Sequence, residues 1–121
     1  MAKPDLMVFG IKQCDTVRKA RRWLDEKKME YRFHDLRVDG FSQKTLTQWL
    51  QSTELDTLVN RRSTTWRQLP QQLRDSADKA QLGALLLEHP ALVKRPVFSR
   101  AGRVLAVGFT NATENLLEQS S

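Results

Sequence analysis

The chain has 121 residues, of which 40% are hydrophobic and 28% are charged, and its formal net charge at neutral pH is +6. A chain of this length buries enough apolar surface for one core, so we expect a single domain spanning residues 1–121. Cys14 is the only cysteine. Its solitude excludes a disulfide-stapled secreted scaffold and a cysteine-rich zinc site, because both need several thiols.

No segment of the sequence predicts export or membrane insertion. The first residues are polar and are followed by a short apolar run, residues 6–9, which is too short for a signal peptide. No window approaches the length of apolar sequence that a membrane span needs. We therefore expect a soluble cytoplasmic protein with no membrane contact, in which Cys14 stays reduced.

The first forty residues predict a strand, a helix and a second strand. Residues 5–10 form a short apolar run ended by glycine, and residues 30–36 alternate at the period of a strand. Between them, Val17, Ala20 and Leu24 form the apolar stripe of a helix of about fourteen residues, capped by Asp15 or Thr16. This order predicts two parallel strands joined by a helical crossover.

Helices are predicted in the middle of the chain, and a strand pair and a helix at its end. Ser42 caps an expected helix over residues 43–51 whose buried face holds Leu46, Trp49 and Leu50. A short helix is expected at 54–59, irregular chain at 60–72, and a helix from Asp75 or Ser76 to His89-Pro90. Residues 96–99 and 103–107 predict an antiparallel hairpin, and Thr110 caps a last helix to about residue 118. The predicted fold is α/β and thioredoxin-like, with a mixed four-stranded sheet and a helical insertion at about residues 42–90.

Cys14 is the candidate nucleophile. A lone cysteine is most often an inert buried side chain, but this one precedes a predicted helix whose N-terminal N–H groups and dipole favour a thiolate. Lys12 and Arg18 add positive charge nearby, and Asp15 opposes them. Ile11 occupies the position of the partner in a CxxC pair, so any disulfide formed by Cys14 must be resolved by an external thiol. Glutathione is the expected co-substrate, because its two carboxylates suit a chain in which 12 of 20 basic residues are arginine.

Three runs of sequence resemble the ArsC/Spx family and its YffB-like branch. They are Gly10 to Leu24, Tyr31 to Gly40 and Arg62 to Arg67, and the short segment Lys94-Arg95-Pro96 is a further match. The resemblance implies a thioredoxin-like fold in which Cys14 is the catalytic residue and Pro96 is a cis proline facing it. It also implies that Arg95 and Arg62, or Arg61 after a one-residue slip, hold an anionic substrate.

The sequence departs from the family pattern in two places that bear on function. Arsenate reductases of the family carry a third arginine after the hairpin, and residues 104–109 contain none. Spx regulators commonly use a CxxC switch, which Ile11 removes. The resemblance and these departures together favour a glutathione-dependent thiol reductase with no bound cofactor or metal. Arsenate reduction and Spx-like binding of RNA polymerase are the alternatives.

The expected substrate site comprises Lys12, Arg18, Arg62, Arg95 and Pro96 around Cys14. Its substrate is a disulfide or an oxyanion, and glutaredoxin or RNA polymerase is the candidate protein partner. Aromatic residues do not alternate with basic ones along a surface, so direct binding of nucleic acid is not expected. Structural roles are expected for both histidines and for Asp35 and Asp39, whereas Trp66 is a candidate to line the site.

Overall fold

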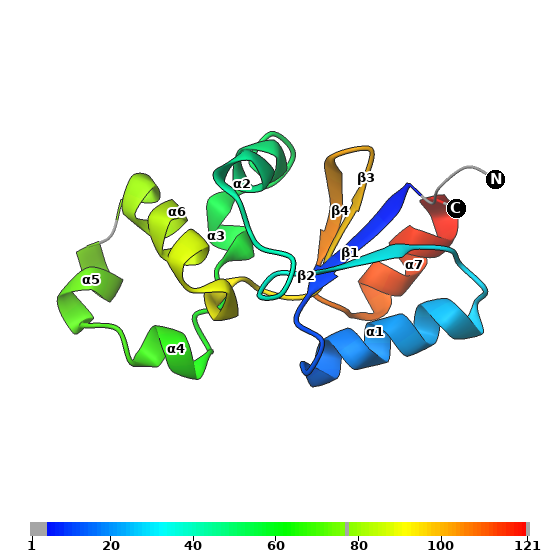
Figure 1. Ribbon diagram of the computed structural model, residues 1–121, viewed down its shortest axis with the longest axis horizontal. Coiled ribbons are helices and arrows are strands. Elements are labelled where there is room, and N and C mark those ends of the chain that lie inside the picture. The colour runs from blue at the N-terminus through cyan, green and yellow to red at the C-terminus, as the bar shows by residue number, and fades with distance from the viewer. Residues whose placement is uncertain (1–4, 77, 121) are drawn as a thin grey trace. The chain divides into compact units, whose positions relative to one another are not determined.

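The computed structural model describes residues 5–76 and 78–120, and its four strands form one mixed sheet in the order β2-β1-β3-β4 (Figure 1). β1 (Leu6–Gly10) runs parallel to β2 (Arg32–Asp35). On its other edge β1 pairs antiparallel with β3 (Val97–Arg100), which pairs antiparallel with β4 (Arg103–Val107). The predicted parallel strand pair, the hairpin and the mixed α/β class are confirmed.

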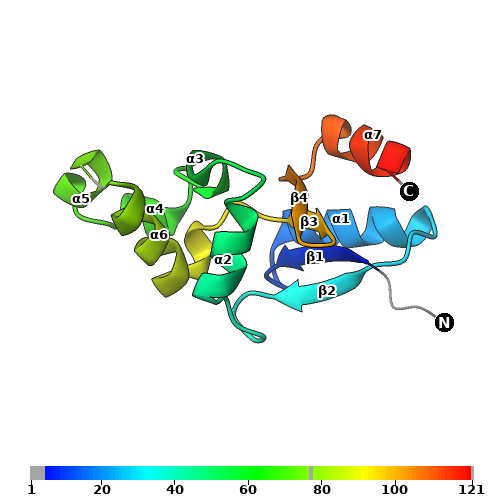
Figure 2. The same ribbon diagram turned by 90° about the horizontal axis from the view of Figure 1, so that it is seen from above.

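Two helices cover one face of this sheet. They are α1 (Asp15–Glu26) and α7 (Asn111–Ser120), which lie on the same side of the strands in Figures 1 and 2. Side chains from both helices and from three positions of the sheet form one buried cluster: Leu6, Val8, Phe98, Ala20, Leu24 and Leu117. The predicted apolar stripe of the first helix is confirmed, because Val17, Ala20 and Leu24 are all buried.

The chain divides into two compact units. The sheet unit comprises the described residues of 1–40 and 95–121, and the helical unit comprises those of 41–94. The helical unit contains α2 (Gln43–Trp49), α3 (Leu55–Leu58), α4 (Thr64–Arg67), α5 (Gln71–Ser76), α6 (Lys79–Glu88) and the 3₁₀ helix η1 (Pro90–Leu92). Within it, α6 packs against α2, α3 and η1. Whether the whole chain behaves as a single domain stays a prediction.

The helix α2 forms largely as its sequence predicts. Ser42 is its N-cap, and the Ser42 hydroxyl accepts the Thr45 N–H at 3.2 Å. Leu46 and Trp49 are buried, but the prediction that Leu50 is buried with them is wrong, because 40% of Leu50 is exposed. The helix ends at Trp49, so Leu50 lies at its C-cap rather than in its last turn.

The helix α6 begins later than its sequence suggests. Asp78 is its N-cap: the Asp78 carboxylate accepts the Gln81 N–H at 2.8 Å, and the Gln81 side chain accepts the Asp78 N–H at 2.9 Å. The predicted start at Asp75 or Ser76 is wrong, because these residues end α5, and the predicted helix also crosses residue 77, outside the described residues. The predicted end is confirmed, with His89 at the C-cap.

Candidate active site

Cys14 is the N-cap residue of α1, in the segment that connects β1 to the helix. Its carbonyl accepts the Arg18 N–H at 3.0 Å, and its own N–H donates to the Ile11 carbonyl at 2.9 Å. The predicted caps, Asp15 and Thr16, are wrong, because the turn from Ile11 to Cys14 starts the helix at Asp15. The first N–H groups of a helix lack intrahelical acceptors and carry the positive end of its dipole. The start of α1 therefore presents partial positive charge and unpaired N–H groups next to the Cys14 side chain.

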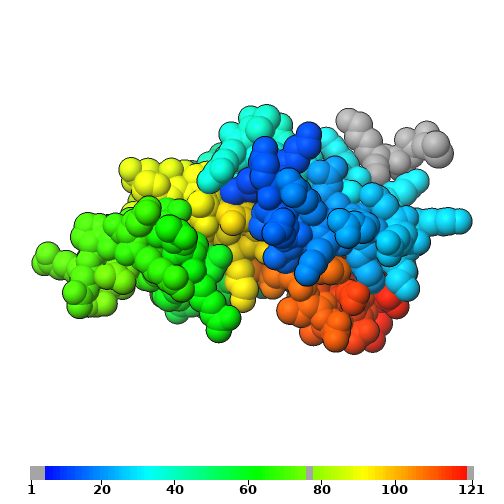
Figure 3. Space-filling model, turned by 90° about the horizontal axis from the view of Figure 1, so that it is seen from below, coloured from blue at the N-terminus to red at the C-terminus, as the bar shows by residue number. Residues whose placement is uncertain are grey.

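The segment around Cys14 lies at the surface of the sheet unit. The thiol is half-buried, and its neighbours Lys12, Gln13 and Asp15 are exposed. Figure 3 shows the end of β1 and the start of α1 as a blue surface patch. A small thiol or disulfide in solution can therefore approach this segment.

A glycine at the end of β1 allows α1 to pack closely against the strand. A Cβ atom built on Gly10 would lie 2.7 Å from Cγ2 of Val17, which is closer than real Cβ contacts allow. Val17 is fully buried, so its side chain has little room to move away. The close approach of strand and helix fixes the ends of the segment that carries Cys14.

Asp35, at the end of β2, holds the same segment from the side. One carboxylate oxygen, Oδ2, accepts the Lys12 N–H at 3.0 Å, and the other, Oδ1, accepts the N–H groups of Arg37 at 2.8 Å and Val38 at 3.0 Å. Burial acts to raise the pKa of Asp35, but the three backbone donors and the nearby Arg37 charge outweigh it and hold the pKa below its usual 3.8. Asp35 is therefore an anionic anchor at neutral pH. Sequence reasoning gave it only a structural role at a strand end and missed its contact with the Cys14 segment.

Pro96 lies beside the same end of the sheet, and its peptide bond with Arg95 is cis. The strand register pairs Phe9 with Val97, so Pro96 precedes the residue opposite the last but one position of β1. The Pro96 carbonyl accepts the Gly108 N–H at 2.8 Å. The structure therefore places Pro96 at the end of the sheet where β1 ends and the Cys14 segment begins.

The basic residues expected around Cys14 differ in their surroundings. Lys12 and Arg18 are exposed, and Arg18 lies 3.7 Å from the Asp15 carboxylate in an exposed ion pair of the kind that contributes little to stability. Arg95 is half-buried and belongs to the sheet unit, as Cys14 does. Cys14, Lys12, Arg18, Arg95 and Pro96 thus lie in one unit.

Arg62 belongs to the helical unit, so its place in the substrate site stays a prediction. Its neighbour Arg61 donates to the Asp56 carboxylate at 2.8 Å, and its guanidinium lies 5.4 Å from the centre of the Trp66 ring. Trp66 is buried, with 7% of its surface exposed, which suits packing inside the helical unit rather than contact with a substrate. Arg61 therefore already has an ion-pair partner and an aromatic contact within the helical unit.

Both histidines have contacts that suit structural roles. The His34 Nε2 lies 2.6 Å from the Gly40 carbonyl oxygen, and its ring packs 5.1 Å from that of Phe9. His89 caps the C-terminus of α6 and lies 3.8 Å from the Glu88 carboxylate. These contacts agree with the expectation that neither histidine is catalytic.

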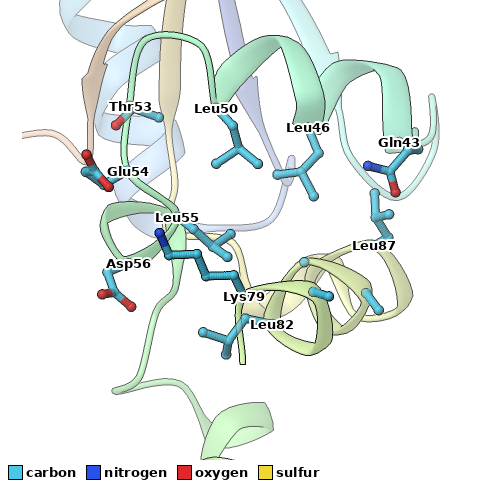
Figure 4. A pocket seen from close by; sticks show the side chains of 13 residues that line it. Gln43, Leu46, Leu50, Thr53, Glu54, Leu55, Asp56, Lys79, Leu82 and Leu87 are labelled. Carbon is cyan, nitrogen blue, oxygen red and sulfur yellow. The ribbon is translucent and has the colours of Figure 1, made fainter. Parts of the chain in front are cut away.

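The helical unit contains a groove of about 600 Å³ between α2, α3 and α6. Figure 4 shows Leu46 of α2 and Leu50 at the C-cap of α2 directed toward α6, with Leu55 and Leu82 lining the space below them. Glu54, Asp56 and Lys79 are its charged residues. None of the predicted site residues lines this groove, so it is a separate feature from the Cys14 segment.

Residues 5–76 and 78–120 contain no helix that is both long and apolar enough to cross a membrane. Within the same ranges, no three side chains of histidine, cysteine, aspartate or glutamate come together as a group able to hold a metal ion.

The chain is similar in sequence to two kinds of curated protein. An uncharacterized protein of Haemophilus influenzae is 46% identical over 104 residues, which cover 86% of this chain and 90% of that one. The global transcriptional regulator Spx of Listeria innocua is 33% identical over 98 residues, covering 79% of this chain and 73% of the regulator.

Solved structures share the fold. A protein named YFFB superimposes with a TM-score of 0.82 at 37% identity, covering 93% of this chain and 96% of that one. An arsenate reductase related protein of Brucella melitensis superimposes with a TM-score of 0.79 at 38% identity, covering 95% of each chain. The thioredoxin-like class expected from the order of elements is confirmed by these neighbours. The ArsC family model matches residues 9–115, from the end of β1 into α7, and the chain therefore belongs to the ArsC family.

Proposed function

We propose that this protein is a glutathione-dependent thiol reductase whose nucleophile is Cys14. The observation that carries the proposal is the position of this half-buried free thiol at the N-cap of α1, on the sheet edge that also holds the cis Arg95-Pro96 bond. The likeness to an arsenate reductase related protein at 38% identity supports thiol-based reduction. Dependence on an external thiol follows from the single cysteine, because no second thiol of the chain can resolve a disulfide at Cys14. We propose glutathione as that thiol, because its two carboxylates suit arginine side chains.

The reaction is two successive thiol–disulfide exchanges. The Cys14 thiolate attacks the glutathione sulfur of a mixed disulfide, the old S–S bond breaks, and the substrate leaves as a thiolate that takes a proton from water. The thiolate of a second glutathione then attacks the Cys14–glutathione disulfide, which releases oxidised glutathione and restores the Cys14 thiolate. The substrate sulfur is reduced, the sulfur of the second glutathione is oxidised, the glutathione sulfur of the mixed disulfide stays at the disulfide level, and the enzyme is unchanged.

Exposure of the protein to oxidised glutathione tests the proposal directly. Intact mass spectrometry is expected to show one glutathione added per chain, located at Cys14 by peptide mapping and removed by excess reduced glutathione. Alkylation of Cys14 by iodoacetamide at pH 7 is expected to be faster than alkylation of free glutathione measured alongside it. Absence of the adduct together with alkylation no faster than that of free glutathione would contradict the proposal.

Arginine side chains are expected to bind the glutathione carboxylates. Arg95→Ala and Arg62→Ala should each weaken glutathione binding by about 1–3 kcal/mol, or roughly 5- to 150-fold, because each change removes a charge-assisted hydrogen bond. The effect is measured as a rise in the KM for glutathione. Arg32→Ala is the matched control, because it removes one exposed positive charge from β2. Equal changes in all three variants would mean that only the overall charge matters.

Two other functions have specific support and are separated by experiment. The Brucella melitensis neighbour is related to arsenate reductase, but residues 104–109 of this chain lack the third arginine of the family's arsenate reductases. Reduction of arsenate with glutathione as donor would favour that alternative. The likeness to Spx makes binding of RNA polymerase the other candidate function. This function predicts that RNA polymerase is retained by immobilised Cys14→Ser protein.

A further inference from the structure

A buried carboxylate joins the Cys14 segment to the neighbouring strand. Asp35 is 6% exposed, and a charge at such a position is costly unless donors surround it. Its three donors are all backbone N–H groups, and they belong to two separate segments of the chain. Loss of a donor or of the acceptor at this position would therefore move the backbone and not merely a side chain.

The two carboxylate oxygens of Asp35 accept hydrogen bonds from different segments of the chain. Oδ1 accepts the N–H groups of Arg37 and Val38, which closes the turn that follows β2. Oδ2 accepts the Lys12 N–H, 23 residues earlier in the chain, and the turn does not need that bond. The second oxygen is therefore available to fix the position of the segment from Ile11 to Cys14.

Further contacts make this segment sensitive to the position of Lys12. The carbonyl of Gly10, the residue before this segment, accepts the Leu36 N–H at 2.8 Å, so the chain is tied to the start of the same turn just before Ile11. The Ile11 carbonyl accepts the Cys14 N–H, and the Ile11 side chain is buried. Lys12 lies between these contacts, and its bond to Asp35 holds the middle of the connection.

We propose that Asp35 is a positioning residue for Cys14: its Oδ2 atom, through the Lys12 N–H, holds the segment that places Cys14 at the N-cap of α1. This inference rests on the proposed role of Cys14 as the nucleophile. It adds a residue outside the conventional reacting groups, from the neighbouring strand, whose effect on the thiol is exerted through the backbone.

The negative charge of Asp35 and its anchoring of Lys12 are expected to change the reactivity of Cys14 in opposite directions. A carboxylate near a thiolate disfavours the thiolate, so removing the charge of Asp35 alone should make Cys14 more reactive. Loss of the Lys12 anchor should instead let the segment relax away from the helix N-terminus and make Cys14 less reactive. In Asp35→Asn the single amide oxygen cannot accept at both sites, so either the turn or Lys12 loses its acceptor.

The test uses iodoacetamide, which reports on Cys14 without any need for glutathione. Alkylation rates of the full chain are measured across pH for the unaltered protein, Asp35→Asn and Asp39→Asn, at a temperature where circular dichroism shows all three to be folded. Asp39→Asn is the matched control: it removes a carboxylate from the same turn that accepts the Asp35 N–H at 2.9 Å and has no contact with Lys12. If Asp35→Asn does not fold, Asp35→Glu takes its place, because it keeps the charge but shifts both oxygens by one methylene.

Asp35→Asn is expected to slow alkylation at pH 7 about 3- to 10-fold, with Asp39→Asn within twofold of the unaltered protein. Faster alkylation of Asp35→Asn, no change, or equal slowing in both variants would overturn the proposal. For Asp35→Glu, slowing supports the proposal and an unchanged profile overturns it. If Asp35→Asn slows alkylation as expected but oxidised glutathione forms no adduct with Cys14, the result counts against the proposed function and not against the role of Asp35.

Discussion

Cys14→Ser is expected to lower the rate of glutathione-dependent reduction of a mixed disulfide to the uncatalysed background, a loss of at least about 1,000-fold. A serine hydroxyl is almost wholly protonated at neutral pH and cannot form a disulfide, so neither exchange step can begin. No other cysteine of the chain can take over, because Cys14 is the only one. The measurement is the release of oxidised glutathione from a small mixed disulfide, followed by coupling to glutathione reductase and oxidation of NADPH.

In this structure, Cys14→Ser is expected to remove the thiol without disturbing the fold. Cys14 is half-buried, lies at the N-cap rather than in the core cluster, and has no side-chain capping bond to lose. Serine is a preferred N-cap residue, so the change should leave the free energy of unfolding within about 1 kcal/mol of its original value, or raise it. Activity that survives in a folded Cys14→Ser protein would show that the chemistry lies elsewhere. Retention of RNA polymerase by this variant would instead separate binding from catalysis.

Local patterns in the sequence were enough for the sheet unit. Alternation and short apolar runs located the strands, and the spacing of Val17, Ala20 and Leu24 located the buried face of α1. These signals were strong because each element faces one core, and burial there follows the period of the element. The parallel pairing of β1 with β2 and the antiparallel pairing of β3 with β4 followed from the order of the elements and the short hairpin turn, whereas the pairing of β1 with β3 was not predicted.

The helical unit was harder to predict because its elements are short. Thr64–Arg67 and Gln71–Ser76 form α4 and α5 inside or beside a stretch expected to be irregular. A helix of one or two turns has no periodic stripe to detect, and its caps are the only local signal. Ser63 accepts the Trp66 N–H at 3.1 Å as the N-cap of α4, and Asp78 with Gln81 marks the true start of α6. These two capping patterns are the local signals that mark where α4 and α6 begin.

The candidate site was predictable where it depends on the start of one helix and not where it depends on distant contacts. The place of Cys14 next to α1 follows from its neighbours in the sequence. The bond from Lys12 to Asp35 spans 23 residues, and an aspartate at a strand end followed by a turn gives no sign that its second oxygen reaches another segment. The position of Pro96 next to the Cys14 segment likewise depends on the register of β3 against β1, which only the folded sheet defines.

The second large effect is expected from truncating the main buried aromatic side chain of each unit. Phe98 is fully buried in the core cluster of the sheet unit, and Trp49 is 1% exposed in the helical unit, where its ring lies 5.0 Å from that of Phe41. Phe98→Ala and Trp49→Ala should each reduce the free energy of unfolding by about 3–5 kcal/mol, because each leaves a cavity that close-packed neighbours cannot fill. That loss is a large share of the roughly 5–15 kcal/mol that stabilises a domain.

The same two variants test whether the chain is one cooperative domain, as its length predicts. Urea unfolding is followed by far-ultraviolet circular dichroism, which reports on both units, and by tryptophan fluorescence. In Phe98→Ala the fluorescence comes from Trp23 in the sheet unit and from Trp49 and Trp66 in the helical unit. For a single domain, Phe98→Ala should lower the midpoint of both signals equally and leave the slope of free energy against urea unchanged. A fluorescence transition in two steps, an early one from Trp23 and a later one from Trp49 and Trp66 at the original midpoint, would show that the helical unit is stable without the sheet unit. Because the Cys14 segment is built on the sheet unit, that outcome would also predict that Phe98→Ala loses reductase activity at urea concentrations where the helical unit is still folded.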